Sequence, residues 1–341
     1  MKRRVFLQSI PALAASMAAG SEPREVMTVR GRIRAERMGV TLTHEHLLAN
    51  FNPHAEGAKE PVDYGRDEVL KIALPHLARI RDLGCRTFID ATAVGLGRDV
   101  RLLRRLSEQS GLNILTTTGN YAAVEYRFLP QYVYDSSPEV LARRWIDEWI
   151  HGIDGTDVRP GFIKLGFNGR ALSDVEKTLI RAGAIAHRET GLAIGAHTGQ
   201  AVAAFEQLDI LAEMGVHPSS WIWIHAQNER DRAQHVTAAR RGAWVSFDGL
   251  GATGQPAADY VDMVNRLRQQ GLLHRALVSQ DAGWYHVGQP HGGTIRAYDA
   301  LFTGFVPAAR SAGFSQADID TLLIRNPAEA FAVAVRRQAR A

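Results

Sequence analysis

The sequence predicts a closed barrel of eight parallel strands with helices outside it, the (β/α)8 or TIM-barrel fold, as a single domain over residues 21–341. The chain has 341 residues, which is enough for one large α/β barrel. From about residue 40 onward, short apolar runs alternate with longer amphipathic segments. No composition break or linker interrupts this alternation, which favours one closed barrel.

The expected strands are continuous apolar runs, as in strands buried on both faces of a parallel sheet. In chain order they are Val40–His46, Thr87–Ala91, Asn113–Thr117, Phe162–Leu165, Leu192–His197, Trp221–His225, Ala243–Phe247 and Leu277–Asp281. An open doubly wound sheet is the alternative fold. No Gly-x-Gly-x-x-Gly pattern follows the first strand to support a dinucleotide site, so the barrel is the better interpretation.

Helices are predicted between the strands. The clearest are Asp67–Leu83, Ser173–Thr190, Ala201–Met214 and Pro256–Gln270. The second begins with a Ser-x-x-Glu capping box formed by Ser173 and Glu176. A glycine directly follows each of the last three, and glycine commonly ends a helix.

The first twenty residues predict a cleavable export signal. Arg3 and Arg4 precede an alanine-rich apolar stretch that is too short for a membrane helix, and small residues at its end offer a cleavage site. The Arg-Arg-x-Phe-Leu order resembles a twin-arginine signal, so we expect export to the periplasm or the cell exterior. A frayed basic helix is the alternative interpretation.

Charge and cysteine content exclude several classes of protein. The net charge is +4, and three of those positive charges lie in the predicted signal, so the rest of the chain is nearly neutral and nucleic-acid binding is not expected. No run of about eighteen apolar residues predicts a membrane span. Cys85 is the only cysteine, which excludes an intramolecular disulfide, and we expect a buried structural thiol.

Metal-ligating side chains fall at the predicted strand ends, where catalytic residues of such barrels cluster. Alternate residues of a strand share a face, so His44 and His46 can both point into the barrel mouth while Glu45 points away. Three further strands end at His197, His225 and Asp281. A lone histidine at a strand end is usually structural, but this set predicts a metal centre.

Lys164 lies within an apolar, strand-like run, where a charged ammonium is costly to bury. It therefore needs an ion-pair partner or a lowered pKa. A neutral lysine amine can take up carbon dioxide to form a carbamate, N6-carboxylysine, which can bridge two metals. The ligand types suit two divalent ions, foremost zinc, with iron, cobalt or manganese as alternatives.

The order of these motifs resembles the phosphotriesterase family of the amidohydrolase superfamily, which includes phosphotriesterase-like lactonases. The similar segments are Gly39-Val40-Thr41-Leu42-Thr43-His44-Glu45-His46, Gly97-Arg98-Asp99, Thr118-Gly119-Asn120-Tyr121, Phe162-Ile163-Lys164, His197-Thr198-Gly199, His225 and Asp281. They span roughly residues 25 to 335 and are specific for the family but not for a substrate.

The resemblance implies roles for these residues. His44, His46 and Asp281 are expected to bind the more buried metal ion, and His197 and His225 the more exposed one. Lys164 as its carbamate is expected to bridge the two ions. Asp281 is also expected to be the catalytic base that takes the proton from a metal-bridging hydroxide as it attacks.

Two positions depart from the family pattern. Asn228 stands where phosphotriesterases have an aspartate, and Gly249 stands where they have a histidine or arginine after the strand-seven aspartate, here Asp248. The outer proton relay of the organophosphate enzymes is therefore expected to be missing. Glu229 is adjacent, but its direction does not follow from the sequence.

The substrate pocket is expected to contain aromatic and basic residues from the loops after the strands. The candidates are Arg98, Tyr121, Tyr126, Trp284, Tyr285 and His286. They suit a partly polar ester or lactone, including one with an anionic group. Alternatively, Trp284 and Tyr285 simply pack their loop onto the barrel.

The leading hypothesis is therefore a metal-dependent hydrolase of a carboxylic ester, lactone or phosphoester. Lactone or ester cleavage and phosphotriesterase (aryldialkylphosphatase) activity are not separated by the sequence. A catalytically silent barrel that binds metal and an extracellular ligand, and amide hydrolysis, are the alternatives. The family resemblance also suggests a homodimer.

Overall fold

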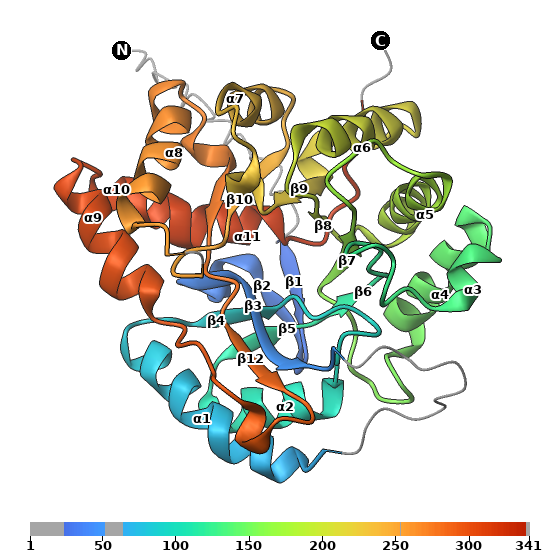
Figure 1. Ribbon diagram of the computed structural model, residues 1–341, viewed down its shortest axis with the longest axis horizontal. Helices are drawn as coiled ribbons and strands as arrows, with labels where there is room; N and C mark the ends of the chain where they lie inside the picture. The colour runs from blue at the N-terminus through green and yellow to red at the C-terminus, as the bar shows by residue number, and fades with distance from the viewer. Residues whose placement is uncertain (1–23, 52–63, 253, 339–341) are drawn as a thin grey trace, which may run out of the picture.

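A computed structural model describes residues 24–51, 64–252 and 254–338 (Figure 1). The predicted export signal, residues 1–20, lies outside the described residues. Parallel strands form the centre of the fold and helices surround them (Figure 1). The predicted (β/α)8 barrel is confirmed.

The barrel strands pair in chain order and in parallel. They are β3 (Thr41–Ala49), β4 (Thr87–Asp90), β5 (Asn113–Leu115) with β6 (Thr117–Thr118), β7 (Phe162–Gly166), β8 (Ile194–His197), β9 (Trp221–Ile224), β10 (Trp244–Phe247) and β11 (Ala276–Val278). Since β5 and β6 are separated by one residue, Thr116, they form the single third strand that the sequence predicts.

The barrel closes between its first and last strands through hydrogen bonds that follow β11. The backbone N–H of His44 donates to the hydroxyl oxygen of Ser279 at 3.0 Å. The N–H of Asp281 donates to the carbonyl oxygen of His44, also at 3.0 Å. These bonds draw the chain after β11 against β3, so the last predicted ligand, Asp281, reaches the first two.

The helices lie outside the strands (Figure 1). They are α1 (Arg66–Asp82), α2 (Val100–Ser110), α3 (Gln131–Tyr134), α4 (Pro138–His151), α5 (Asp174–Thr190), α6 (Ala201–Glu213), α7 (Ala233–Arg240), α8 (Ala257–Gln269), α9 (Val306–Ser311), α10 (Gln316–Asp320) and α11 (Asn326–Ala330). The predicted capping box is present, because Ser173 accepts from the N–H of Glu176 and Glu176 accepts from the N–H of Ser173. Short 3₁₀ or π turns are Ala35–Met38, Pro218–Ser220, Ala226–Asn228, Leu273–Arg275, Pro290–Gly292, Leu301–Phe305 and Thr321–Arg325.

Three strands were not predicted from the sequence. β1 (Glu25–Thr28) and β2 (Gly31–Arg34) form an antiparallel hairpin ahead of the barrel. β12 (Gly283–His286) pairs in parallel with the end of β3, with Gly283 opposite His46. This pairing extends β3 to Ala49, three residues beyond the predicted end. His46 therefore lies inside a strand.

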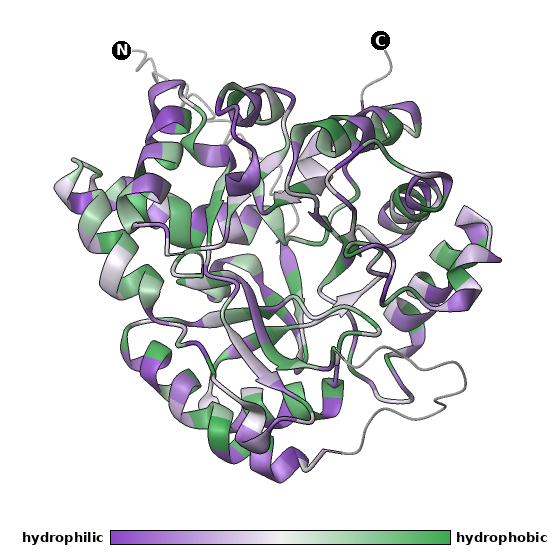
Figure 2. Ribbon diagram, in the orientation of Figure 1, coloured by the Kyte–Doolittle hydropathy of each residue, from purple (hydrophilic) through white to green (hydrophobic). Residues whose placement is uncertain are grey.

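The core consists of large apolar side chains from the strands, including Trp221, Trp223 and Trp244, all of which are fully buried. Hydrophobic and hydrophilic residues alternate along the surrounding helices, as in helices packed on one face (Figure 2). The Cys85 thiol is buried and donates to the carbonyl of Thr87, and burial raises its pKa to about 12. The predicted structural thiol is confirmed. Within the described residues, none of the helices has the length and apolar character needed to cross a membrane.

Candidate metal centre

The six predicted metal ligands line one cavity of about 200 Å³ at the carboxyl ends of the barrel strands. His44 and His46 lie on β3, Lys164 on β7 and His197 at the end of β8. His225 directly follows β9, and Asp281 lies three residues after the end of β11. Both have positive φ angles, 62° and 53°. The strand-end pattern in the sequence therefore locates all six, although the last two are turned into place by left-handed backbone.

The ligand atoms lie close together. Nε2 of His44 is 3.3 Å from Nε2 of His46 and 3.3 Å from Nζ of Lys164. Nε2 of His46 is 3.0 Å from Oδ1 of Asp281. The ligand atoms of His44, His225 and Asp281 all lie within 4.8 Å of one another, and the rings of His197 and His225 are 4.4 Å apart.

Hydrogen bonds on the outer side of the rings indicate which nitrogen faces inward as an acceptor. Nδ1 of His44 lies 3.2 Å from a carboxylate oxygen of Asp248, so it carries the proton. Nδ1 of His46 lies 2.9 Å from the hydroxyl of Thr92, which itself donates to the carbonyl of Leu48. Both Nε2 atoms are therefore lone-pair acceptors.

Two acceptors that face each other at 3.3 Å are suited to bind one cation together. Two imidazole nitrogens bound tetrahedrally at about 2.0–2.1 Å from zinc lie about 3.3 Å apart, which is the separation of the two Nε2 atoms. Oδ1 of Asp281 is buried as well and faces Nε2 of His46 at 3.0 Å, so a third ligand atom points to the same place. The residues present therefore fit a divalent metal centre.

Burial sets the protonation of this centre. Burial lowers the pKa of His44 to about 3 and that of His197 well below its ordinary value, so both are neutral, as ligands must be. Burial also lowers the pKa of Lys164 to about 8, which makes a neutral amine accessible. Burial alone raises the pKa of Asp281, but its close contact with His46 and the other neighbouring histidines hold it below its ordinary value.

Asp248, which directly follows β10, is a functional residue that the sequence analysis noted only as a neighbour of Gly249. Its fully buried carboxylate contacts Nδ1 of His44 at 3.2 Å and Nδ1 of His225 at 2.6 Å. It thus orients ligands from two different strands. Its position at a strand end was the signal that could have identified it.

Replacing Asp248 with asparagine is expected to lower the affinity of the metal-free protein for zinc by about 10–100-fold, because the amide group cannot accept from both histidines. Zinc titration against a competing chelator measures this. Ser246→Ala is the matched control, since it removes a 2.7 Å hydrogen bond to the same carboxylate but leaves both histidine contacts intact. Equal affinities of Asp248→Asn and the parent protein would contradict the orienting role.

Two predicted substrate residues, Tyr121 and Trp284, line the metal cavity. The Tyr121 hydroxyl lies 3.1 Å from Nδ1 of His197. The Trp284 ring stacks on His46 with centroids 3.7 Å apart. The other side chains at the opening are apolar and were not predicted: Phe51, Leu96, Val124 and Phe128. All four follow the ends of the first three barrel strands, and this position in the sequence could have identified them.

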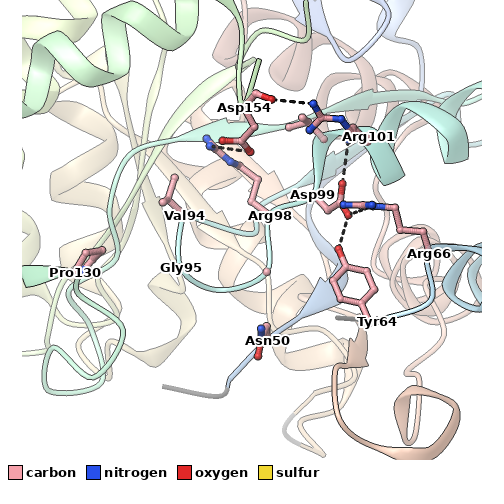
Figure 3. Close-up of a pocket in the computed structure, with 12 residues that line it drawn as sticks. Asn50, Tyr64, Arg66, Val94, Gly95, Arg98, Asp99, Arg101, Pro130 and Asp154 are labelled. Atoms are coloured by element: carbon pink, nitrogen blue, oxygen red, sulfur yellow. Dashed lines mark hydrogen bonds and ion pairs between the residues drawn. The ribbon is translucent and has the colours of Figure 1, made fainter. Parts of the chain in front are cut away.

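Arg98, predicted to line the substrate pocket, does not line the metal cavity. Its side chain is 5% exposed and forms a bidentate ion pair with Glu148, at 2.7 and 2.8 Å, with a further bond to the carbonyl of Thr117. It borders a separate pocket of about 410 Å³, where it lies beside Asp154 (Figure 3). The sequence motif gives the position of Arg98 in the chain, but its ion-pair partner on α4, Glu148, determines where the side chain points.

Tyr126, Tyr285 and His286 also lie outside the set of cavity-lining residues. The Tyr126 hydroxyl donates to Ser173 at 3.1 Å. Tyr285 is buried and packs beside Gly292, as one of the sequence alternatives had it. Successive residues of β12 point to opposite faces, so Tyr285 turns away from the cavity that Trp284 lines. The His286 ring lies 5.6 Å from that of Phe51, at the edge of the opening.

Neither Glu229 nor position 249 supplies Asp281 with an outer proton relay of the kind that the organophosphate enzymes have. Glu229 accepts from the N–H of Ala201 at 2.9 Å and from the N–H of Asp231 at 2.8 Å, so its carboxylate is committed to backbone amides. A Cβ at Gly249 would lie 2.6 Å from the amide nitrogen of Gln227. Gln227 therefore fills the space that a side chain at position 249 needs.

Comparison with known proteins agrees with this geometry. The family model described as "Phosphotriesterase family" matches residues 24–331. A phosphotriesterase homology protein of Escherichia coli is 32% identical over 86% of this chain and 98% of its own. An aryldialkylphosphatase of Saccharolobus solfataricus is 28% identical over 88% of this chain and 96% of its own. An N-acetyltaurine hydrolase of Mus musculus is 27% identical over 89% of this chain and 96% of its own.

The fold is also shared with solved structures. One is a protein in which organophosphate hydrolysis activity was engineered from a weak promiscuous lactonase template, and it superposes with a TM-score of 0.81. It is 27% identical and covers 90% of this chain and 99% of its own. An organophosphorus hydrolase variant from Deinococcus radiodurans gives the same TM-score and identity, and the match covers 92% of this chain and 100% of its own.

Proposed function

The chain belongs to the phosphotriesterase family, and from that premise we propose that this metal-dependent hydrolase acts on lactones or carboxylic esters in preference to phosphotriesters. One observation carries the proposal: the residues at the positions of the outer relay, Asn228 and Gly249, offer neither an acid nor a base to pass a proton outward from Asp281. Gly249 has no side chain, and the carboxylate of Glu229 accepts from backbone amides. Lactone opening needs such a relay less, because the leaving alkoxide stays tethered and can itself accept the proton.

We further propose that the centre holds two divalent ions, most favourably zinc, and that Lys164 bridges them as N6-carboxylysine. In support, Nζ of Lys164 lies 3.3 Å from Nε2 of His44, and burial favours its neutral amine. His44, His46 and Asp281 would hold one ion, and His197 and His225 the other. When bound, the ions activate a water and polarise the carbonyl or phosphoryl oxygen of the substrate.

Side chains of the protein carry out the proton transfer and the binding of the substrate. Oδ1 of Asp281 faces His46 at 3.0 Å, whereas the side chain as a whole is 24% exposed. Its carboxylate would hold the proton released on attack and return it to the alkoxide. Trp284 and Phe128 offer apolar surface to the part of the substrate that does not react, and Tyr121 restrains His197. Together they exclude water from the bond that breaks.

The test of the substrate class is a kinetic comparison on one metal-loaded sample. We expect kcat/KM for a lactone or aryl ester to exceed that for a paraoxon-like triester by at least about 100-fold, or about 2.7 kcal/mol. Equal or higher efficiency with the triester would show that the outer relay is dispensable and would reverse the proposal. A panel of N-acyl amino acids and amidosulfonates in the same assay tests the amide-hydrolase alternative.

We also propose that the chain is exported by the twin-arginine route, on the basis of the Arg3-Arg4 pair and the apolar stretch after it. Replacing both arginines with lysine is expected to leave precursor in the cytoplasm, because this route reads the arginine pair. Cell fractionation followed by immunoblotting measures the distribution. Normal export of the variant would indicate the general secretory route instead.

A further inference from the structure

Asp281, the proposed proton acceptor, has an uncommon backbone conformation. Its φ is 53°, in the left-handed region that residues other than glycine seldom adopt. Such a conformation persists only where the surrounding structure holds it. Two polar side chains outside the ligand set, Glu45 and Arg296, contact the backbone on either side of Asp281.

Glu45 lies between the two ligands of β3 and is fully buried. Both of its oxygens accept hydrogen bonds from the chain around Asp281. Oε1 accepts from the Ser279 hydroxyl at 2.7 Å and from the Gln280 N–H at 3.1 Å. Oε2 accepts from the Ala282 N–H at 2.7 Å. The carboxylate that the sequence pattern directs away from the cavity is thus bound to the segment that carries the base.

Arg296 contacts the same segment from its carbonyl side. Its Nη2 donates to the carbonyl of Gln280 at 2.9 Å and to the carbonyl of Asp281. The backbone of Arg296 is itself fixed, because it exchanges two hydrogen bonds with Gly283, each 3.0 Å long. The indole N–H of Trp284 donates to the Asp281 carbonyl as well, at 2.8 Å.

Both side chains therefore act on one peptide group, the one that joins Asp281 to Ala282. Its N–H points to the Glu45 carboxylate and its C=O points to the Arg296 guanidinium. Because a peptide group is planar, fixing both ends fixes its rotation, and with it ψ of Asp281. The N–H of Asp281 is held by the carbonyl of His44, which restrains the preceding peptide.

We propose that Glu45 and Arg296 are positioning residues that lock the Asp281–Ala282 peptide, and so aim the Asp281 carboxylate at His46 and the metal centre. The proposal rests on the proposed function in one respect, the role of Asp281 as proton acceptor. Neither residue is among those that line the metal cavity.

The test uses two variants that each remove one side of the lock. Glu45→Gln is isosteric, but its NH2 group faces donors and cannot accept from them. Arg296→Met keeps the aliphatic stem and removes all donors, and Arg296→Lys restores a donor and should recover part of the loss. The matched control is Glu176→Gln, since Glu176 is also fully buried and accepts from backbone amides of Asn168 and Ser173, at 2.8 and 2.9 Å, away from Asp281.

In the metal-loaded enzyme, Glu45→Gln and Arg296→Met are each expected to lower kcat by about 10–100-fold, with KM within about threefold and metal content unchanged. Because both act on one peptide, the double variant should lose less than the product of the two single losses. Glu176→Gln should keep kcat within about threefold. If Glu45→Gln does not fold, Arg296→Met and its lysine rescue decide the question.

A second readout does not depend on activity. In the metal-free protein, amide hydrogen exchange of residues 279–283 should be faster in Glu45→Gln and Arg296→Met than in the parent and in Glu176→Gln. Unchanged exchange and unchanged kcat in both variants would overturn the proposal. An active Asp281→Asn variant would instead remove Asp281 as the proton acceptor, and it would leave the exchange result intact.

Discussion

Replacing Lys164 with alanine is expected to lower kcat/KM by at least about 100-fold and to release at least one metal ion per chain. Loss of a residue that only orients a ligand already costs about 10–100-fold, and a group that bridges two ions should cost no less. Nζ of Lys164 is buried and lies 3.3 Å from Nε2 of His44, inside the set of proposed ligands. Steady-state kinetics and elemental analysis with added bicarbonate measure both effects.

Chemical rescue distinguishes the carbamate from a structural lysine. Acetate or propionate can enter the space left in Lys164→Ala and supply the two oxygens of the carbamate, so activity should partly return. Lys164→Arg should show no rescue, because a guanidinium stays charged and forms no carbamate. Lys177→Ala, on the surface of α5, is the matched control and should behave as the parent. Full activity of Lys164→Ala without added carboxylate would make this lysine structural.

Asp281→Asn is expected to lower kcat by about 10²–10⁴-fold, the usual contribution of a general base. The amide keeps an oxygen toward the metal but cannot hold the proton, so most of the metal should remain bound. Kinetics and metal analysis of the same sample separate these effects. Asp209→Asn, which breaks only a surface ion pair with Arg241, is the control. A decrease of less than about threefold in Asp281→Asn would assign the proton to another group.

Local patterns in the sequence were sufficient for the barrel and for the positions of its proposed ligands. Strand periodicity places His44 and His46 on one face, and the apolar run around Lys164 indicates a buried amine. These features depend on neighbours a few residues away in the chain, which a sequence displays directly. The capping box of α5 and the buried thiol of Cys85 followed in the same way.

The tertiary structure decided which side chains meet across the barrel. Arg98 forms an ion pair with Glu148, fifty residues later in the chain, and therefore does not line the metal cavity. Asp248 joins ligands from β3 and β9, and Glu45 contacts Ala282 from the other end of the sequence. No local pattern encodes such pairs, because they exist only once the first and last strands are brought together.

The sequence by itself therefore determined the fold, the family resemblance and the set of six side chains proposed to bind metal. It could not determine the left-handed backbone at His225 and Asp281, or the direction of Glu45. Backbone in that region is stable only when contacts from distant segments offset its cost. The Asp248 carboxylate accepts from the N–H of His225, and Glu45 and Arg296 contact the backbone around Asp281. The physical reason is that strand position follows from local periodicity, whereas side-chain direction at the strand ends follows from non-local hydrogen bonds.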